Sequence, residues 1–246
     1  MNKNWLKSAA LVALFISTAA SAADIPAPVY KAAPAIVPLY NWSGLYIGGH
    51  AGGGWGHPTF TNLANTSTFG GALPGQSFTQ SSSGFIGGGQ IGYNWQVSNW
   101  VWGLEASFAG STIKGTSTNF TDDQFNNKLR DLLLIGGRLG YASNNWLFYG
   151  KGGYAGASRR ASVVDNAIVS PGVGSGSATA WHNGWNAGAG IEYGLTAHWI
   201  LGVQYDYVNL SSKSYQLDAT DGGGLSYLFG IKANYQLVTG RASYKF

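Results

Sequence analysis

Cysteine is absent from this sequence of 246 residues, and only 10% of the residues carry a formal charge. The lack of thiols excludes disulfide frameworks, thiolate metal sites and cysteine nucleophiles. Soluble domains usually carry about 25% charged residues, so the shortage of charge indicates a surface that does not face water. No run of lysine or arginine marks a basic patch, and no nucleic-acid partner is expected.

Long hydrophobic runs are also lacking, so no transmembrane helix is predicted. The short apolar stretch within residues 1–22 follows Lys3 and Lys7 and leads to a small-residue cleavage motif that ends at Ala22. This pattern is typical of a secretory signal peptide. Residues 23–41 hold four of the seven prolines and are predicted to form an extended periplasmic linker.

Glycine and aromatic residues are abundant instead: there are 38 glycines, 10 tryptophans, 14 tyrosines and 11 phenylalanines. They occur in eight segments in which bulky apolar residues alternate with small or polar ones, the period of a β-strand. The segments cover residues 45–55, 85–96, 102–108, 135–141, 146–154, 185–195, 199–207 and 238–246. Together they predict an all-β fold over residues 42–246.

The connections between these segments alternate in length. Turns are expected at Ser98-Asn99, at 143–145 and at 196–198, whereas long polar connections are expected at 57–82, 112–128, 158–181 and 211–235. Short turns on one side and long loops on the other are typical of a transmembrane barrel. The sequence therefore predicts an eight-stranded antiparallel up-and-down β-barrel in the outer membrane of a Gram-negative cell, with its termini in the periplasm.

Charged residues within the strands fall on the face opposite the large aromatics, where glycine and polar residues dominate. A soluble barrel would have the reverse arrangement, so we expect the aromatic face to contact lipid and the charges to point into the lumen. The predicted lumen network is Glu105, Arg138, Lys151, Glu192, Asp206 and Arg241. Buried charges must pair, and the network has two interpretations, a polar plug that holds the barrel together or a gate whose alternative pairings open a water path.

Four histidines raise the question of a heme or metal site. None of them has the two-residue strand spacing or the four-residue helix spacing that would preset one. No serine lies beside a histidine on a defined strand face, so no hydrolase site is indicated. We therefore expect no catalytic residues, no metal and no cofactor.

The C-terminal strand ends in Tyr244 and Phe246 on one face. A terminal aromatic on a closing strand resembles the signal that the barrel assembly machinery reads, although Gly240 departs from the usual pattern by one place. Arg159 and Arg160 could contact lipopolysaccharide phosphates or form a solvated pair at a strand end.

Five motifs resemble the small outer-membrane barrel proteins of alphaproteobacteria, a porin-family group that includes major surface antigens, RopB-type proteins and hemin-binding relatives. The motifs are NWSGLYIGG at 41–49, GGGQIGYNW at 87–95, RLGY at 138–141, AGAGIEY at 187–193 and YKF at 244–246. The resemblance implies an eight-stranded barrel like the OmpA transmembrane domain, and a role in the envelope or in host contact.

The function expected from the sequence is that of an integral outer-membrane barrel with a structural or surface role and at most weak passive permeability. The alternative is a heme-binding or host-contact adhesin that acts through its extracellular loops. The expected partners are outer-membrane lipid, lipopolysaccharide and the barrel assembly machinery, and the sequence leaves association into homo-oligomers open.

Overall fold

A computed structural model describes residues 40–63, 73–118, 124–164, 176–218 and 226–246. The predicted signal peptide, and the predicted linker up to residue 39, lie outside the described residues. Strands and turns account for the ordered structure that is described. No helix among these residues is long and apolar enough to cross a membrane.

Eleven strands are present in the described part of the chain, and seven of them exceed twelve residues. They are β1 (Gly44–Gly56), β2 (Thr59–Asn62), β3 (Ser77–Thr79), β4 (Ser82–Val97), β5 (Trp100–Ser111), β6 (Lys114–Thr118), β7 (Gln124–Ser143), β8 (Trp146–Val164), β9 (Gly176–Gly194), β10 (Trp199–Asp218) and β11 (Ser226–Lys245).

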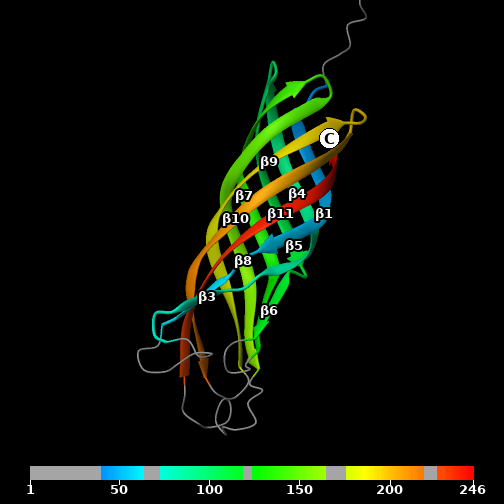
Figure 1. The fold of residues 1–246 in the computed structure, drawn as a ribbon. Helices are drawn as coiled ribbons and strands as arrows, with labels where there is room; N and C mark the ends of the chain where they lie inside the picture. The colour runs from blue at the N-terminus through cyan, green and yellow to red at the C-terminus, as the bar shows by residue number, and fades with distance from the viewer. Residues whose placement is uncertain (1–39, 64–72, 119–123, 165–175, 219–225) are drawn as a thin grey trace, which may run out of the picture. The chain divides into compact units, whose positions relative to one another are not determined.

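Eight of these strands form a closed antiparallel ring, in the order β1-β4-β5-β7-β8-β9-β10-β11 (Figure 1). The ring closes because β11 pairs with β1, from Tyr46 opposite Lys245 to Gly56 opposite Tyr235. The eight-stranded barrel predicted from the sequence is thereby confirmed. The other three strands lengthen the wall at the loop end: β2 follows β1 and pairs with β3 and β11, and β6 follows β5 and pairs with β7.

The short turns lie where the sequence predicts them. Ser98 and Asn144 adopt positive φ angles of 54° and 53° at the turns between β4 and β5 and between β7 and β8. Asparagine tolerates this left-handed conformation better than most residues, since its side chain can bond the local backbone. At the first of these turns Asn99 Nδ2 also donates a hydrogen bond to the Ala142 carbonyl, 2.8 Å away.

The predicted sorting of side chains is also observed. Outward-facing Phe85, Leu104 and Leu139 are 77%, 61% and 57% exposed, whereas inward-facing Glu105 and Arg138 are only 5% and 4% exposed. Such an inside-out arrangement would be unfavourable in water, because it exposes large apolar side chains and buries charges. It fits a wall that faces hydrocarbon.

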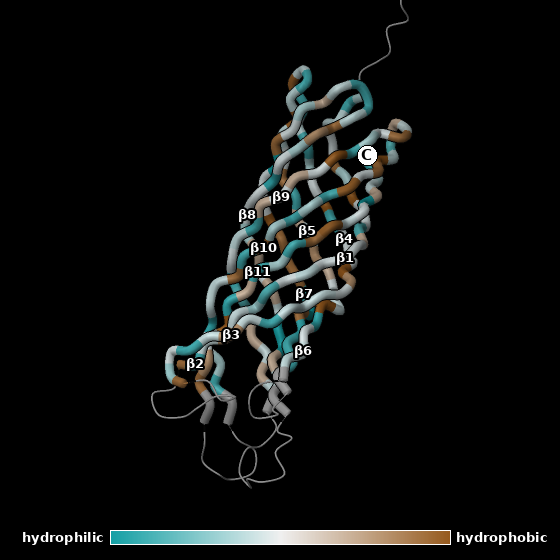
Figure 2. The backbone as a smooth tube through the Cα atoms, in the orientation of Figure 1, coloured by the Kyte–Doolittle hydropathy of each residue, from teal (hydrophilic) through white to brown (hydrophobic). Residues whose placement is uncertain are grey.

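The four long connections are shorter than predicted. Much of 57–82, 112–128, 158–181 and 211–235 is strand. These regions contain β2, β3 and β6 and the ends of β7 to β11 that lie away from the short turns, and we call this part of the barrel its distal half. In this distal wall the outer face is polar and the inner face is apolar, as at the buried residues Phe60, Ile113 and Leu129. The hydrophobic alternation changes phase there, so a stretch of paired strand resembles a polar loop in sequence. Figure 2 shows β6 in hydrophilic to neutral colours near the loop end.

The interior of this distal half is consequently mainly apolar, although a few polar side chains such as Asn127, Arg159 and His182 are buried in it. One buried cluster combines Ile86, Ala109, Ile113, Leu129, Leu132, Leu134, Ala155, Ala157, Val208, Leu210, Ala233, Tyr235 and Leu237. A second cluster, of Phe60, Ala161, Tyr215, Phe229 and Ile231, packs in the same half. On the distal side of the charged network, the lumen is thus filled much like the core of a soluble protein.

Two adjacent glycines of β7 test this packing. A Cβ on inward-facing Gly136 would collide with the backbone of Gly152 and Gly153 in β8, whereas a Cβ on outward-facing Gly137 would lie 3.8 Å from the nearest atom, the Gly103 carbonyl oxygen. We expect Gly136→Ala to lower the free energy of unfolding by about 1–3 kcal/mol. Gly137→Ala should leave it nearly unchanged. Urea unfolding of the two variants in lipid vesicles measures the difference, and equal stabilities would contradict the strand packing described.

Candidate functional site

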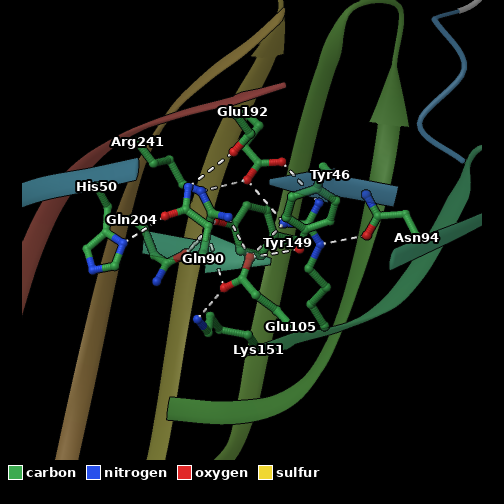
Figure 3. Close-up of polar contacts among 12 residues, drawn as sticks. Tyr46, His50, Gln90, Asn94, Glu105, Tyr149, Lys151, Glu192, Gln204 and Arg241 are labelled. Carbon is green, nitrogen blue, oxygen red and sulfur yellow. Dashed lines mark hydrogen bonds and ion pairs between the residues drawn. The ribbon is translucent and has the colours of Figure 1, made fainter. Parts of the chain in front are cut away.

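The six charged residues predicted for the lumen come together in one cluster (Figure 3). Each comes from a different strand, and the six strands are consecutive in the ring, from β5 through β11. Their side chains are all at most 5% exposed. The structure thus brings the whole predicted set together, and it forms a layer across the lumen.

Glu105 lies at the centre of the layer. One carboxylate oxygen accepts a hydrogen bond from Lys151 Nζ at 2.8 Å, and the other pairs with Arg241 and accepts from the Tyr46 hydroxyl at 2.8 Å. Arg138 Nη1 approaches the same carboxylate at 3.6 Å. One acid therefore faces three bases, and charge-assisted hydrogen bonds of this kind are the strong ones.

Glu192 is the second acid, and it holds two arginines. Arg138 donates to both of its oxygens at 3.1 Å, and Arg241 Nε lies 3.1 Å from one of them. The Arg138 guanidinium is also flanked by the rings of Tyr46 and Tyr149, each with its centroid 4.8 Å from Cζ. The guanidinium is thus held by bidentate hydrogen bonds in its plane and by aromatic faces, both of which suit its planar shape.

Asp206 completes the layer more loosely. Its Oδ2 accepts from Gln204 Nε2 at 2.6 Å, while its Oδ1 lies 3.8 Å from Lys151 Nζ and makes no hydrogen bond to the described residues. Three acids and three bases sum to zero charge. Balance is required here, because removing either partner of a buried ion pair leaves an uncompensated charge in a medium of low dielectric constant.

Glycines opposite the charged residues make room for the layer. Gly188 stands opposite both Lys151 and Asp206, and Gly202 stands opposite both Glu192 and Arg241. A Cβ on Gly188 would lie 2.6 Å from Asp206 Oδ1. The glycine-rich inner face is therefore explained by the volume of the charged side chains.

Sequence reasoning did not single out several polar partners of the network. Tyr46, Asn94, Tyr149 and Gln204 all bond to its members. Their alternation with the outward-facing residues predicts that they face the lumen. No sequence pattern, however, identifies an inward-facing tyrosine as the partner of a carboxylate.

The end of the lumen near the short turns is filled by residues 40–42. Trp42 is fully buried and packs with Tyr40, Leu147 and Ile200. Its backbone is held by Gln96 Oε1, which accepts from the Trp42 amide at 2.7 Å, and by Asn94, whose amide donates to the Trp42 carbonyl. The end of the predicted linker is therefore part of the barrel's packing, and we call residues 40–42 the stopper.

A small cavity lies between the charged layer and the distal apolar cluster. Its volume is about 20 Å³, and its lining includes His50, Glu105 and Asp206 on one side and Leu134 and Leu237 on the other. A space of this size admits about one water molecule.

Three of the four histidines form ring hydrogen bonds within the protein, whereas His57 is exposed and its backbone amide donates to the Asn234 carbonyl at 3.2 Å. His50 Nδ1 bonds Gln90 Oε1 at 2.7 Å, His182 contacts the Ser211 carbonyl and the Tyr215 hydroxyl, and His198 Nδ1 bonds the Lys245 carbonyl at 2.9 Å. No cluster of three possible metal ligands occurs among the described residues.

Arg159 and Arg160 do not form a pair, because adjacent residues of a strand face opposite sides. Arg159 is fully buried inside the lumen, where Nη2 donates to Asn127 Oδ1 at 2.7 Å. Arg160 is exposed on the outer wall. Of these two arginines, Arg160 is therefore the one whose side chain is accessible from outside the barrel.

Tyr244 and Phe246 lie at the seam of the barrel. Their rings contact each other edge to face at 5.1 Å, and the Phe246 amide donates to the Leu45 carbonyl at 2.9 Å. Recognition of these two residues by the assembly machinery stays a prediction.

Comparison with known proteins identifies the family to which this chain belongs. Residues 8–246 match the model of the outer membrane protein beta-barrel domain. The 31 kDa outer-membrane immunogenic protein of Brucella melitensis is 31% identical over 96% of this chain and 98% of its own length. The 22 kDa outer membrane protein of Rhizobium leguminosarum bv. viciae is 31% identical over 75% of this chain and 72% of its own length.

Among solved structures, the outer membrane protein OprG from Pseudomonas aeruginosa is similar in fold, with a TM-score of 0.54 and 13% identity over 83% of this chain and 96% of that one. The resemblance to alphaproteobacterial outer-membrane proteins is thereby confirmed. The chain is an outer-membrane protein that belongs to the outer membrane protein beta-barrel domain family.

Proposed function

We propose that this outer-membrane protein is a closed barrel with a structural and surface role, and that it conducts solutes weakly or not at all. The observation that carries the proposal is the filling of the lumen at three levels. The stopper of residues 40–42, the charged layer around Glu105 and the distal apolar cluster follow one another along the barrel. An eight-stranded barrel has room only for its own side chains or one small ligand.

Opening of the charged layer alone would not create a water path. Glu105 and Glu192 each contact more than one base, so a rearranged pairing would still leave bulky side chains across the lumen. Beyond them, Leu134 and Leu237 belong to the apolar cluster, which excludes water without any ion pair. We therefore favour the plug over the gate.

The surface role draws on the relatives, whose names describe immunogenic outer-membrane proteins. For this chain we propose that the end of the barrel opposite the short turns is exposed to the outside. The heme-binding and host-contact alternatives depend on loops that lie largely outside the described residues, and no contact among the described histidines favours them.

Neutralising the central acid tests the plug. We expect Glu105→Gln to lower the free energy of unfolding by about 3–5 kcal/mol, because three buried bases lose a shared partner. Planar bilayers should stay electrically silent with this variant, as with wild type, since the stopper and the apolar cluster are intact. Asp131→Asn, a half-buried acid of β7 without an ion pair to the described residues, is the matched control and should change stability little.

Frequent conductance steps with Glu105→Gln would favour the gate and contradict the closed barrel. Unchanged stability with this variant would contradict a structural role for the charged layer.

The stopper can be tested with a pair of tryptophans. Trp42→Ala should lower the free energy of unfolding by about 3–5 kcal/mol, because a fully buried side chain is removed from the lumen. Trp100, which is 56% exposed on the outer wall, provides the control, and Trp100→Ala should cost less. Vesicles that contain either variant should not swell in small sugars. Swelling with Trp42→Ala would show that the stopper alone closes the lumen, and it would contradict the proposal that the lumen is closed at three levels.

A further inference from the structure

Three basic residues form a row across the outer wall of the distal half. Lys114 of β6 stands directly opposite Lys128 of β7, and Lys128 stands directly opposite Arg160 of β8. All three are exposed, and they face outward because the residues beside them, such as Ile113, Leu129 and Arg159, are buried in the lumen. We call these three residues the basic row.

Like charges that face each other directly on neighbouring strands are destabilising. No ion pair neutralises the basic row among the described residues, and Arg160 Nη2 donates a hydrogen bond to the uncharged Ser177 Oγ at 3.1 Å. Nearby Asp131 makes no ion pair within the described part of the chain. Asp122 and Asp123, the next acids along the sequence, lie outside it. Every acid of the lumen, in contrast, faces a base.

The position of the basic row relative to the membrane follows from the apolar belt. On β5, β7 and β8 the large outward apolar residues run from Trp100 to Phe108, from Tyr141 to Leu133 and from Trp146 to Tyr154. Eight residues of tilted strand rise about 20 Å, close to the apolar band of a transmembrane barrel. The basic row follows roughly 10–15 Å beyond these residues, on the side of the long connections.

With the end opposite the short turns outside, as proposed above, that depth corresponds to the headgroup region of the outer leaflet. Basic residues there meet amphiphiles whose phosphates are held at a fixed level by their acyl chains. Lysine binds phosphate as a point charge and arginine binds it through a planar fork of donors, so three such groups in a row suit a ligand with more than one phosphate.

We propose that Lys114, Lys128 and Arg160 bind the phosphate groups of lipopolysaccharide at the rim of the barrel. The site rests on the outer-membrane location of the protein and on the proposed orientation of the barrel, and it does not depend on whether the lumen conducts. Arg159, its neighbour in sequence, has no part in it, since this side chain is enclosed in the lumen. The bound phosphates offset the repulsion within the basic row.

A charge-matched pair of variants tests the proposal. Lys128 is the central member of the row, whereas Lys232 of β11 is also exposed but lies across the ring, opposite Thr59 of β2. The folded wild type, Lys128→Gln and Lys232→Gln are titrated in detergent micelles with purified lipopolysaccharide, and binding is measured by native mass spectrometry. We expect Lys128→Gln to weaken binding about fivefold, the effect of one basic group near an anionic surface. Lys232→Gln should weaken it much less.

Dephosphorylated lipopolysaccharide and inorganic phosphate identify the ligand. The dephosphorylated form should bind wild type and Lys128→Gln equally weakly, and inorganic phosphate at the same concentration should not displace lipopolysaccharide. An equal loss of lipopolysaccharide affinity in both lysine variants would show that only the overall charge matters, and it would contradict a site at the basic row. Displacement by inorganic phosphate would also overturn it, because the row would then be a free-phosphate site.

A second measurement separates binding from folding. Without any lipid phosphate, Lys128→Gln should raise the melting temperature, because it removes repulsion from two neighbours, and Lys232→Gln should not. Lipopolysaccharide should raise the melting temperature of wild type more than that of Lys128→Gln. A lower melting temperature for Lys128→Gln in the absence of lipid would contradict the proposal.

Discussion

Hydrocarbon offers no hydrogen-bond partner to a polypeptide backbone, and this constraint governs the rest of the molecule. A sheet in lipid must satisfy every N–H and C=O internally, so its first and last strands have to meet. Here β11 pairs with β1 along eleven residue pairs, from Tyr46–Lys245 to Gly56–Tyr235. Closure with only eight strands gives a narrow lumen, and a narrow lumen must be filled by the inward-facing side chains themselves.

The kind of side chain that fills the lumen changes along the barrel, according to whether the outer face of the wall is apolar or polar. Where the outer face is apolar, the inner face carries the charged layer, in which each base is matched by an acid and glycines provide the space. Where the outer face becomes polar, the inner face becomes an ordinary apolar core around Leu132, Leu210 and Tyr235. One continuous sheet therefore contains two opposite kinds of sorting, and the basic row lies on the distal side of the transition, where the outer face is polar.

Much of this architecture could be predicted from the sequence, because period-two alternation is strong wherever one face is lined by large rings. The same parity identified all six residues of the charged layer. The distal wall was missed since apolar residues move there from the outer to the inner face, as between Phe108 and Ile113, and the alternation loses its phase. Arg159 and Arg160 were consequently treated as a pair at a strand end, although two adjacent residues within a strand must face opposite sides. The stopper at Trp42 and the tyrosines around Arg138 follow from three-dimensional packing, which no local pattern carries.

The central claim is that the bulky apolar side chains of the wall face lipid while the charged side chains face the lumen. Measuring contact between side chains and lipid acyl chains tests this claim most directly. The barrel can be folded into lipid nanodiscs with labelled leucine methyl groups, and nuclear Overhauser effects to lipid acyl protons can be recorded. Leu104, Leu139 and Leu201 should show strong effects, because they are 61%, 57% and 44% exposed on the outer wall. Leu134, Leu147 and Leu237 should show none, because they are buried in the lumen. The reverse pattern, with acyl contacts at the second set and none at the first, would contradict the account.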